Sequence, residues 1–100
     1  MLTTYSLFFT SVAPGVPTVT SSKTIFGDGD EAILTCTLAG TGFPEPTIQW
    51  VKSGTDVPSE TGTTLTFAAV TFSDDGDYTC RATNDFGMAT SPARTLTVTA

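Results

Sequence analysis

Two cysteines are the residues of this chain whose chemistry needs deciding first. Cys36 and Cys80 can form one disulfide, but two thiols are too few for a four-cysteine zinc site. The 100 residues include no histidine, which excludes Cys₂His₂ sites, Ser-His and Cys-His nucleophile pairs and the commonest general base. The chain has no Cys-x-x-Cys motif, the pattern that would suggest redox catalysis. We therefore predict no enzyme activity, and the cysteines are either a structural disulfide or a reduced, buried pair.

Acidic residues gather in two segments whose composition is typical of turns. The two clusters are Asp28, Asp30 and Glu31, and Asp74, Asp75 and Asp77. Neither cluster follows the spacing of an EF-hand calcium loop. Paired carboxylates can also act as general acid and base, but no other candidate site residue accompanies them. We expect solvated turn residues here, and we predict no metal or other cofactor.

The balance of charges restricts the classes of partner. Four Lys and Arg residues stand against ten Asp and Glu, so the formal net charge is −6. Nucleic acids and anionic membranes need a basic surface, which argues against both as partners. No segment approaches the roughly 20 apolar residues that span a bilayer, so direct membrane insertion is not expected. The surface of another protein is the partner class that this composition allows.

The first fifteen residues differ from the rest of the chain. Leu7, Phe8 and Phe9 are apolar, but threonines and serines flank them, and no Lys or Arg precedes Lys23. A secretory signal needs a basic start and an unbroken apolar stretch. We therefore interpret residues 1–15 as a linker or flanking strand, with a leader peptide as the alternative, and residues 16–100 as one domain.

Short alternating segments separated by turn residues follow from residue 16 onward. We predict strands over residues 17–22, 23–26, 31–38, 47–52, 63–67, 77–83 and 95–98. Nine Gly and six Pro mark the connections, and no segment has helical periodicity. Seven short strands at this spacing predict an all-β fold of the sandwich class.

Several motifs stand at fixed places among these strands. They are GDEA at 29–32, LTC at 34–36, IQW at 48–50, DDGDYTC at 74–80 and NDFG at 84–87. Together they resemble a domain of the immunoglobulin superfamily, of the intermediate (I-set) type, over residues 16–99. The resemblance implies an immunoglobulin-like Greek-key β-sandwich of two antiparallel sheets.

The resemblance also assigns structural roles to individual residues. It implies a Cys36–Cys80 disulfide between the sheets, with Trp50 packed beside it. Tyr78 stands two residues before the second cysteine, the position of the tyrosine corner. The expected core residues are Trp50, Tyr78, Leu34 and Leu65. Gly87 is expected in the left-handed position of the hairpin turn at 84–87.

The function that the resemblance implies is non-catalytic protein binding. We expect a module from the ectodomain of a cell-surface adhesion molecule or receptor, located outside the cell, with neighbouring immunoglobulin-type domains in the full chain. The alternative is a structural bead of an intracellular muscle-type array, similar to titin, in which the cysteines would be reduced. Homophilic and heterophilic binding both remain open.

One face of the predicted sandwich is a candidate for protein contact. Gln49 and Val51 alternate with the inward residues of their strand, and Arg81 and Thr83 do so on the second-cysteine strand. Phe86 is placed at the tip of the following turn. These five residues form the candidate contact face, for which an ordinary solvated sheet surface is the alternative.

Overall fold

Alternating apolar and polar residues form nine strands in the part of the chain that the computed structural model describes, residues 12–40 and 42–100. In chain order they are β1 (Thr18–Ser21), β2 (Ile25–Gly27), β3 (Ala32–Thr37), β4 (Thr47–Lys52), β5 (Thr55–Asp56), β6 (Thr64–Phe67), β7 (Gly76–Asn84), β8 (Gly87–Thr90) and β9 (Arg94–Thr99). A short 3₁₀ helix, η1 (Phe72–Asp74), precedes β7. Within the described residues, no helix is long and apolar enough to cross a membrane.

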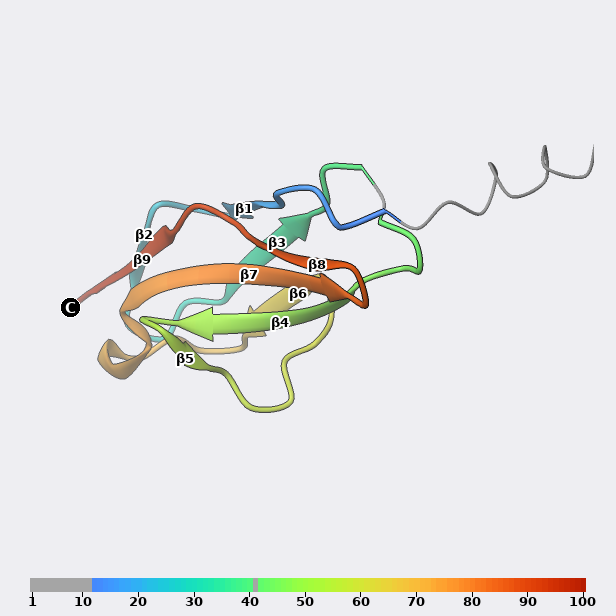
Figure 1. Ribbon diagram of the computed structural model, residues 1–100. Coiled ribbons are helices and arrows are strands. Elements are labelled where there is room, and N and C mark those ends of the chain that lie inside the picture. The colour runs from blue at the N-terminus through green and yellow to red at the C-terminus, as the bar shows by residue number, and fades with distance from the viewer. Residues whose placement is uncertain (1–11, 41) are drawn as a thin grey trace, which may run out of the picture.

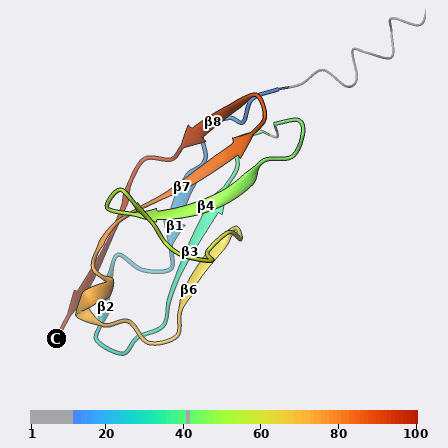
Figure 2. The ribbon, with the colours of Figure 1, turned by 60° about the horizontal axis from the view of Figure 1, so that its bottom comes forward.

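The strands form two sheets that pack as a sandwich (Figure 1). One sheet has the order β1-β3-β6, with β6 at its edge (Figure 2). The other has the order β2-β9-β7-β4-β5, and β8 also pairs with β7. The chain passes from one sheet to the other between β1 and β2, β2 and β3, β3 and β4, β5 and β6, and β6 and β7, and these crossovers give the Greek-key connection. The predicted all-β sandwich is therefore confirmed, although β2 and β9 pair in parallel.

Two strands and the role of one glycine differ from the sequence predictions. β5 has two polar residues and β8 begins with Gly87, so neither shows the alternation that marks a strand. Gly87 was expected in the left-handed region, but its φ is not positive. A Cβ at this position would lie 2.8 Å from the Cβ of Ala13. Glycine is needed here because residues 12–14 pass close to the hairpin.

A disulfide and one tryptophan hold the two layers together. Cys36 of β3 and Cys80 of β7 are bonded, with their Cα atoms 6.1 Å apart, which confirms the predicted disulfide. Trp50 lies opposite Cys80 in the register of β4 with β7, is fully buried, and donates its Nε1–H to the Gly62 carbonyl at 2.8 Å. Leu34 and Leu65 face each other across β3 and β6 and are also buried. The core therefore lies directly between the central strands of the two sheets.

Tyr78 fixes the connection that enters β7. Its buried hydroxyl donates to the Asp74 carbonyl at 2.6 Å, which is the bond expected of a tyrosine corner. Gly76 has a φ of +152°, a conformation that other residues rarely adopt. Burial raises the pKa of Tyr78 from 10.0 to about 12, and the Asp74 and Asp75 carboxylates add to the shift.

Asn84, the last residue of β7, joins three segments of the chain. The β7–β8 hairpin lies at the end of the sandwich where the described chain begins (Figure 1). Its Nδ2 donates to the carbonyls of Val12, at 2.7 Å, and Pro44, at 3.0 Å. Its Oδ1 accepts a bond from the Phe86 amide at 2.9 Å. Val12 and Phe43 also exchange two backbone hydrogen bonds. The loop before β4 and the β7–β8 hairpin are thereby held in place.

Removing the disulfide should lower stability strongly. The bond closes a loop with a sequence separation of 44 residues. In the chain-entropy model such a loop contributes about 4 kcal/mol. We expect the double variant Cys36→Ala, Cys80→Ala to lose about this much free energy of unfolding in urea denaturation. Equal stability of the parent chain with and without reductant would contradict this expectation.

The raised pKa of Tyr78 makes stability depend on alkaline pH. The folded state favours the neutral phenol, so its contribution is complete below pH 10.0 and is lost as pH rises through about 12. Urea denaturation across this interval should show a decline in unfolding free energy that the Tyr78→Phe variant lacks. The same decline in both chains would show that Tyr78 is not its cause.

Replacing Asn84 should loosen the loops it joins. We expect Asn84→Ala to lower the free energy of unfolding by about 1–2 kcal/mol, because two donated bonds and one accepted bond are lost. Amide hydrogen exchange at Val12 and Phe43 should become faster. Asn84→Asp keeps the acceptor for Phe86 but loses both donors, so it should show the same faster exchange. Unchanged protection in both variants would contradict the assigned role.

Candidate functional site

Three residues of the candidate contact face lie together on the outer side of the β4–β7 pair. Gln49 is opposite Arg81, and Thr47 is opposite Thr83, so their side chains share one side of the sheet. β8 extends this surface, because Met88 lies opposite Thr83 and is 63% exposed. Sequence reasoning missed Met88 because the β8 strand was not predicted.

Val51 does not belong to the exposed surface, which corrects the sequence prediction. It is only 8% exposed although it lies on the outer side of β4. Its neighbours across the sheet are Asp56 of β5 and Thr79 of β7. Arg81 reaches across β4 to Asp56, with 3.1 Å between Nη2 and Oδ2. The ion pair spans β4 on the side of the sheet where Val51 lies, and β5 and β7 flank the valine.

Phe86 occupies the tip of the β7–β8 hairpin, next to the contact face. Its side chain is 55% exposed and does not pack back into the core. Two further apolar side chains, Val12 and Phe43, are about half exposed at the same end of the sandwich. Neither was singled out from the sequence, because their proximity depends on the backbone bonds between residues 12 and 43.

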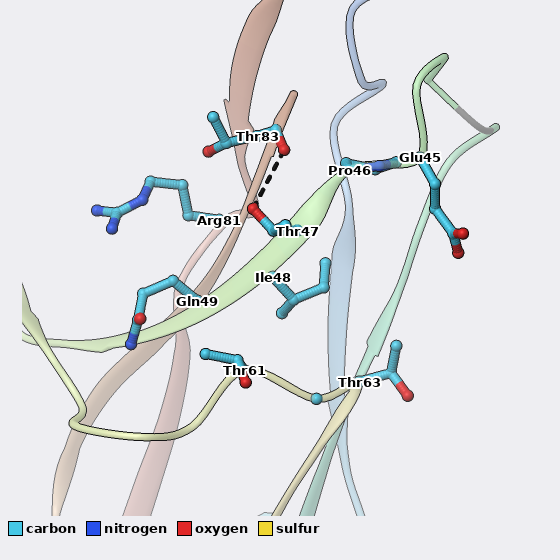
Figure 3. Close-up of a pocket in the computed structure, with 10 residues that line it drawn as sticks. Glu45, Pro46, Thr47, Ile48, Gln49, Thr61, Thr63, Arg81 and Thr83 are labelled. Atoms are coloured by element: carbon cyan, nitrogen blue, oxygen red, sulfur yellow. Dashed lines mark hydrogen bonds between the residues drawn. The ribbon is translucent and has the colours of Figure 1, made fainter. Parts of the chain in front are cut away.

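A groove lies beside the first half of β4 (Figure 3). We call it the β4 groove; its volume is about 770 Å³, within the range of roughly 300–1,000 Å³ seen for ligand sites. Ile48 lies between β4 and the segment that carries Thr61 and Thr63 (Figure 3). The residues that line it include Pro46, Ile48, Gln49, Thr61, Thr63 and Arg81. The groove therefore adjoins the contact face and adds a wall from residues 61–63, where the predicted strand 63–67 begins.

A smaller hollow continues the β4 groove toward the β7–β8 hairpin. It has a volume of about 220 Å³ and shares Glu45, Thr47 and Thr83 with the larger one. At its far end it is lined by Asn84 and Asp85. Both hollows are thus parts of one surface that runs across the β4–β7 pair.

The β4 groove borders a sheet edge that β5 leaves open. β5 pairs only with Val51 and Lys52 of β4. The backbone groups of Trp50 point away from β7. Its N–H donates to the Glu60 backbone carbonyl, and its carbonyl accepts a bond from the Val57 amide. Alternate residues of a strand direct these groups to the same side, so those of Ile48 point into the groove. Within residues 12–40 and 42–100, no backbone group forms a hydrogen bond with the N–H or C=O of Ile48 on the groove side.

Each of the four basic side chains contacts a group of the domain itself. Lys23 pairs with Asp30, Lys52 donates to the Ser73 carbonyl, Arg81 pairs with Asp56, and Arg94 donates to the Ser21 hydroxyl. The pKa of Asp30 is held below its usual range, mainly by a hydrogen bond from the Gly27 amide and next by the hydrogen bond and charge of Lys23. By contrast, the exposed carboxylates of Glu45 and Asp85 have no hydrogen bond or ion pair within the described part of the chain.

The groups around the groove are suited to recognition. They offer threonine hydroxyls, two amides, one guanidinium and two carboxylates beside an apolar floor formed by Pro46 and Ile48. Among the described residues, no group of three His, Cys, Asp or Glu side chains could hold a metal ion. The arrangement can bind a polar chain by hydrogen bonds and charge.

Comparisons with known proteins agree with this architecture. A family model for the immunoglobulin domain matches residues 14–84. Human MAM domain-containing glycosylphosphatidylinositol anchor protein 2 is 32% identical over 90 residues, which are 87% of this chain and 9% of that protein. Rat vascular cell adhesion protein 1 is 35% identical over 85 residues, which are 81% of this chain and 11% of that protein. The chain thus spans a small part of the length of these relatives.

A solved structure shows the same fold. Murine CEACAM1b superposes with a TM-score of 0.75 at 20% identity, over 86% of this chain and 45% of that one. Identity this low supports a shared fold alone. The family match covers most of the chain and includes β1 to β7, the Cys36–Cys80 disulfide and the buried Trp50. The chain therefore belongs to the immunoglobulin-domain family.

Proposed function

We propose that this chain is a non-catalytic protein-binding module of a cell-surface adhesion molecule or receptor. The observation that carries the proposal is the continuous outer surface of β4, β7 and β8, where Gln49, Arg81 and Thr83 adjoin the exposed Met88 and Phe86. Exposed apolar and aromatic side chains beside polar groups are typical of contact surfaces. Two similar proteins, vascular cell adhesion protein 1 and neural cell adhesion molecule L1, are adhesion molecules by name.

The location and surroundings of the module belong to the same proposal. A disulfide persists in oxidising compartments, which supports an extracellular location over an intracellular muscle-type array. The chain covers only 9–11% of two relatives, which supports neighbouring immunoglobulin-type domains in the full protein. Residues 1–15 as a linker and the I-set subtype stay predictions, and residues 1–11 lie outside the described chain.

A matched pair of threonine variants tests the contact face. Thr83→Arg places a bulky cation on the face, whereas Thr66→Arg places it on the exposed side of the opposite sheet. We expect multimerised parent chain to bind the surface of cells from the source organism, and Thr83→Arg to weaken binding about tenfold or more, as loss of a central contact does. Thr66→Arg should bind as the parent does. Equal loss in both variants, or none in either, would contradict the proposed face.

A further inference from the structure

We propose that the β4 groove binds an extended, positively charged segment of a partner protein, which adds to β4 as a further strand. This inference rests on the proposed protein-binding function and specifies its partner. Extended peptides bind exposed sheet edges through backbone hydrogen bonds, with alternate side chains in pockets. The open edge, the shape of the groove and its charge each support this occupant.

The open edge supplies the backbone bonds. The N–H and C=O of Ile48 point into the groove, and β5 covers only the last two residues of β4. Pro46, which precedes β4, has no backbone N–H to donate, so the open edge of β4 ends there. A partner residue opposite Ile48 would exchange two hydrogen bonds with it, as in a hydrogen-bonded pair of an antiparallel ladder. Its side chain would share the apolar floor, and its two neighbours would lie beside Thr47 and Gln49.

The domain's own bonds hold the groove open. The wall that carries Thr61 and Thr63 is attached to the core, because the Gly62 carbonyl accepts from Trp50 and the Thr63 carbonyl accepts from Cys36. At the other end, Glu60 is bonded to the Trp50 amide at 3.0 Å. These bonds keep the intervening loop away from Ile48, so a partner would enter a preformed site.

The charges near the groove favour a basic occupant. Glu45 lines both hollows, and Asp85 lies at the far end of the smaller one. The guanidinium of Arg81 is already paired with Asp56. The local balance is therefore negative, as is the net charge of −6 for the whole chain. Complementary charges favour a lysine-rich or arginine-rich segment, and repulsion between two such acidic chains disfavours a second copy.

Peptide titration followed by NMR tests the inference on the isotope-labelled chain. The probe is an acetylated and amidated peptide, TKVKVKT, and the matched control is TEVEVET. Alternation lets the valines face Ile48 while the lysines face Glu45. We expect the lysine peptide to bind in low salt, with the largest shifts at the Ile48 amide and at residues 61–63. The glutamate peptide should not bind, and methylation of the central peptide nitrogens should abolish binding.

Charge variants separate the groove from the net charge of the domain. Glu45→Gln with Asp85→Asn should weaken binding of the lysine peptide about threefold to tenfold, because exposed charge pairs are individually weak. Asp28→Asn with Glu31→Gln removes the same charge from the turn before β3, away from the groove, and should leave binding unchanged. A comparable loss in both double variants would overturn the groove as the site.

The remaining outcomes also decide between occupants. Equal binding of both peptides, shifts confined to other surfaces, or no binding in low salt would each overturn the inference. Concentration-dependent dimers with shifts at Ile48 would replace the basic segment by a second copy. If the Thr83→Arg variant loses cell binding while the parent does not bind the lysine peptide, the proposed function stands and the groove inference fails. Peptide binding without any cell-surface binding would instead contradict the proposed function.

Discussion

The bond between Cys36 and Cys80 joins the two layers at the place on which the rest of the packing depends. β3 and β7 each have a strand on both sides, so the disulfide links the centres of the sheets. Trp50 fills the space beside it, and its indole nitrogen bonds the loop before β6. A domain of this size buries a modest core, which makes a covalent link between the layers especially important.

The same core determines the shape of the candidate site. Because Trp50 bonds to Gly62 and Glu60, the loop between β5 and β6 is held beside β4 without covering its first half. The resulting groove adjoins the outer surface of β4 and β7. Asn84 fixes the neighbouring loop and hairpin, and so places Asp85 and Phe86 at one end of that surface. Trp50 and Asn84 therefore stabilise the domain and also shape the candidate site.

The sequence predicted those elements whose residues alternate over several positions. β3, β4 and β7 place apolar side chains at every second position, and the cysteine and Trp50 motifs lie on them. Periodicity placed Val51 on the outer side of β4, but it could not predict the Arg81–Asp56 pair that spans β4 on that side, since this pair requires the short β5. The groove could not be predicted, because its walls come from segments that only the folded chain brings together.

The central claim is a cell-surface module whose two sheets are joined by a disulfide. Its most direct test is the mass of the intact protein, purified from its own cells and treated with a thiol alkylating reagent. The structure predicts that neither Cys36 nor Cys80 reacts without reductant and that both react after reduction and unfolding. Two alkylated thiols in unreduced, unfolded protein would contradict the disulfide and the extracellular location, and would favour an intracellular array instead.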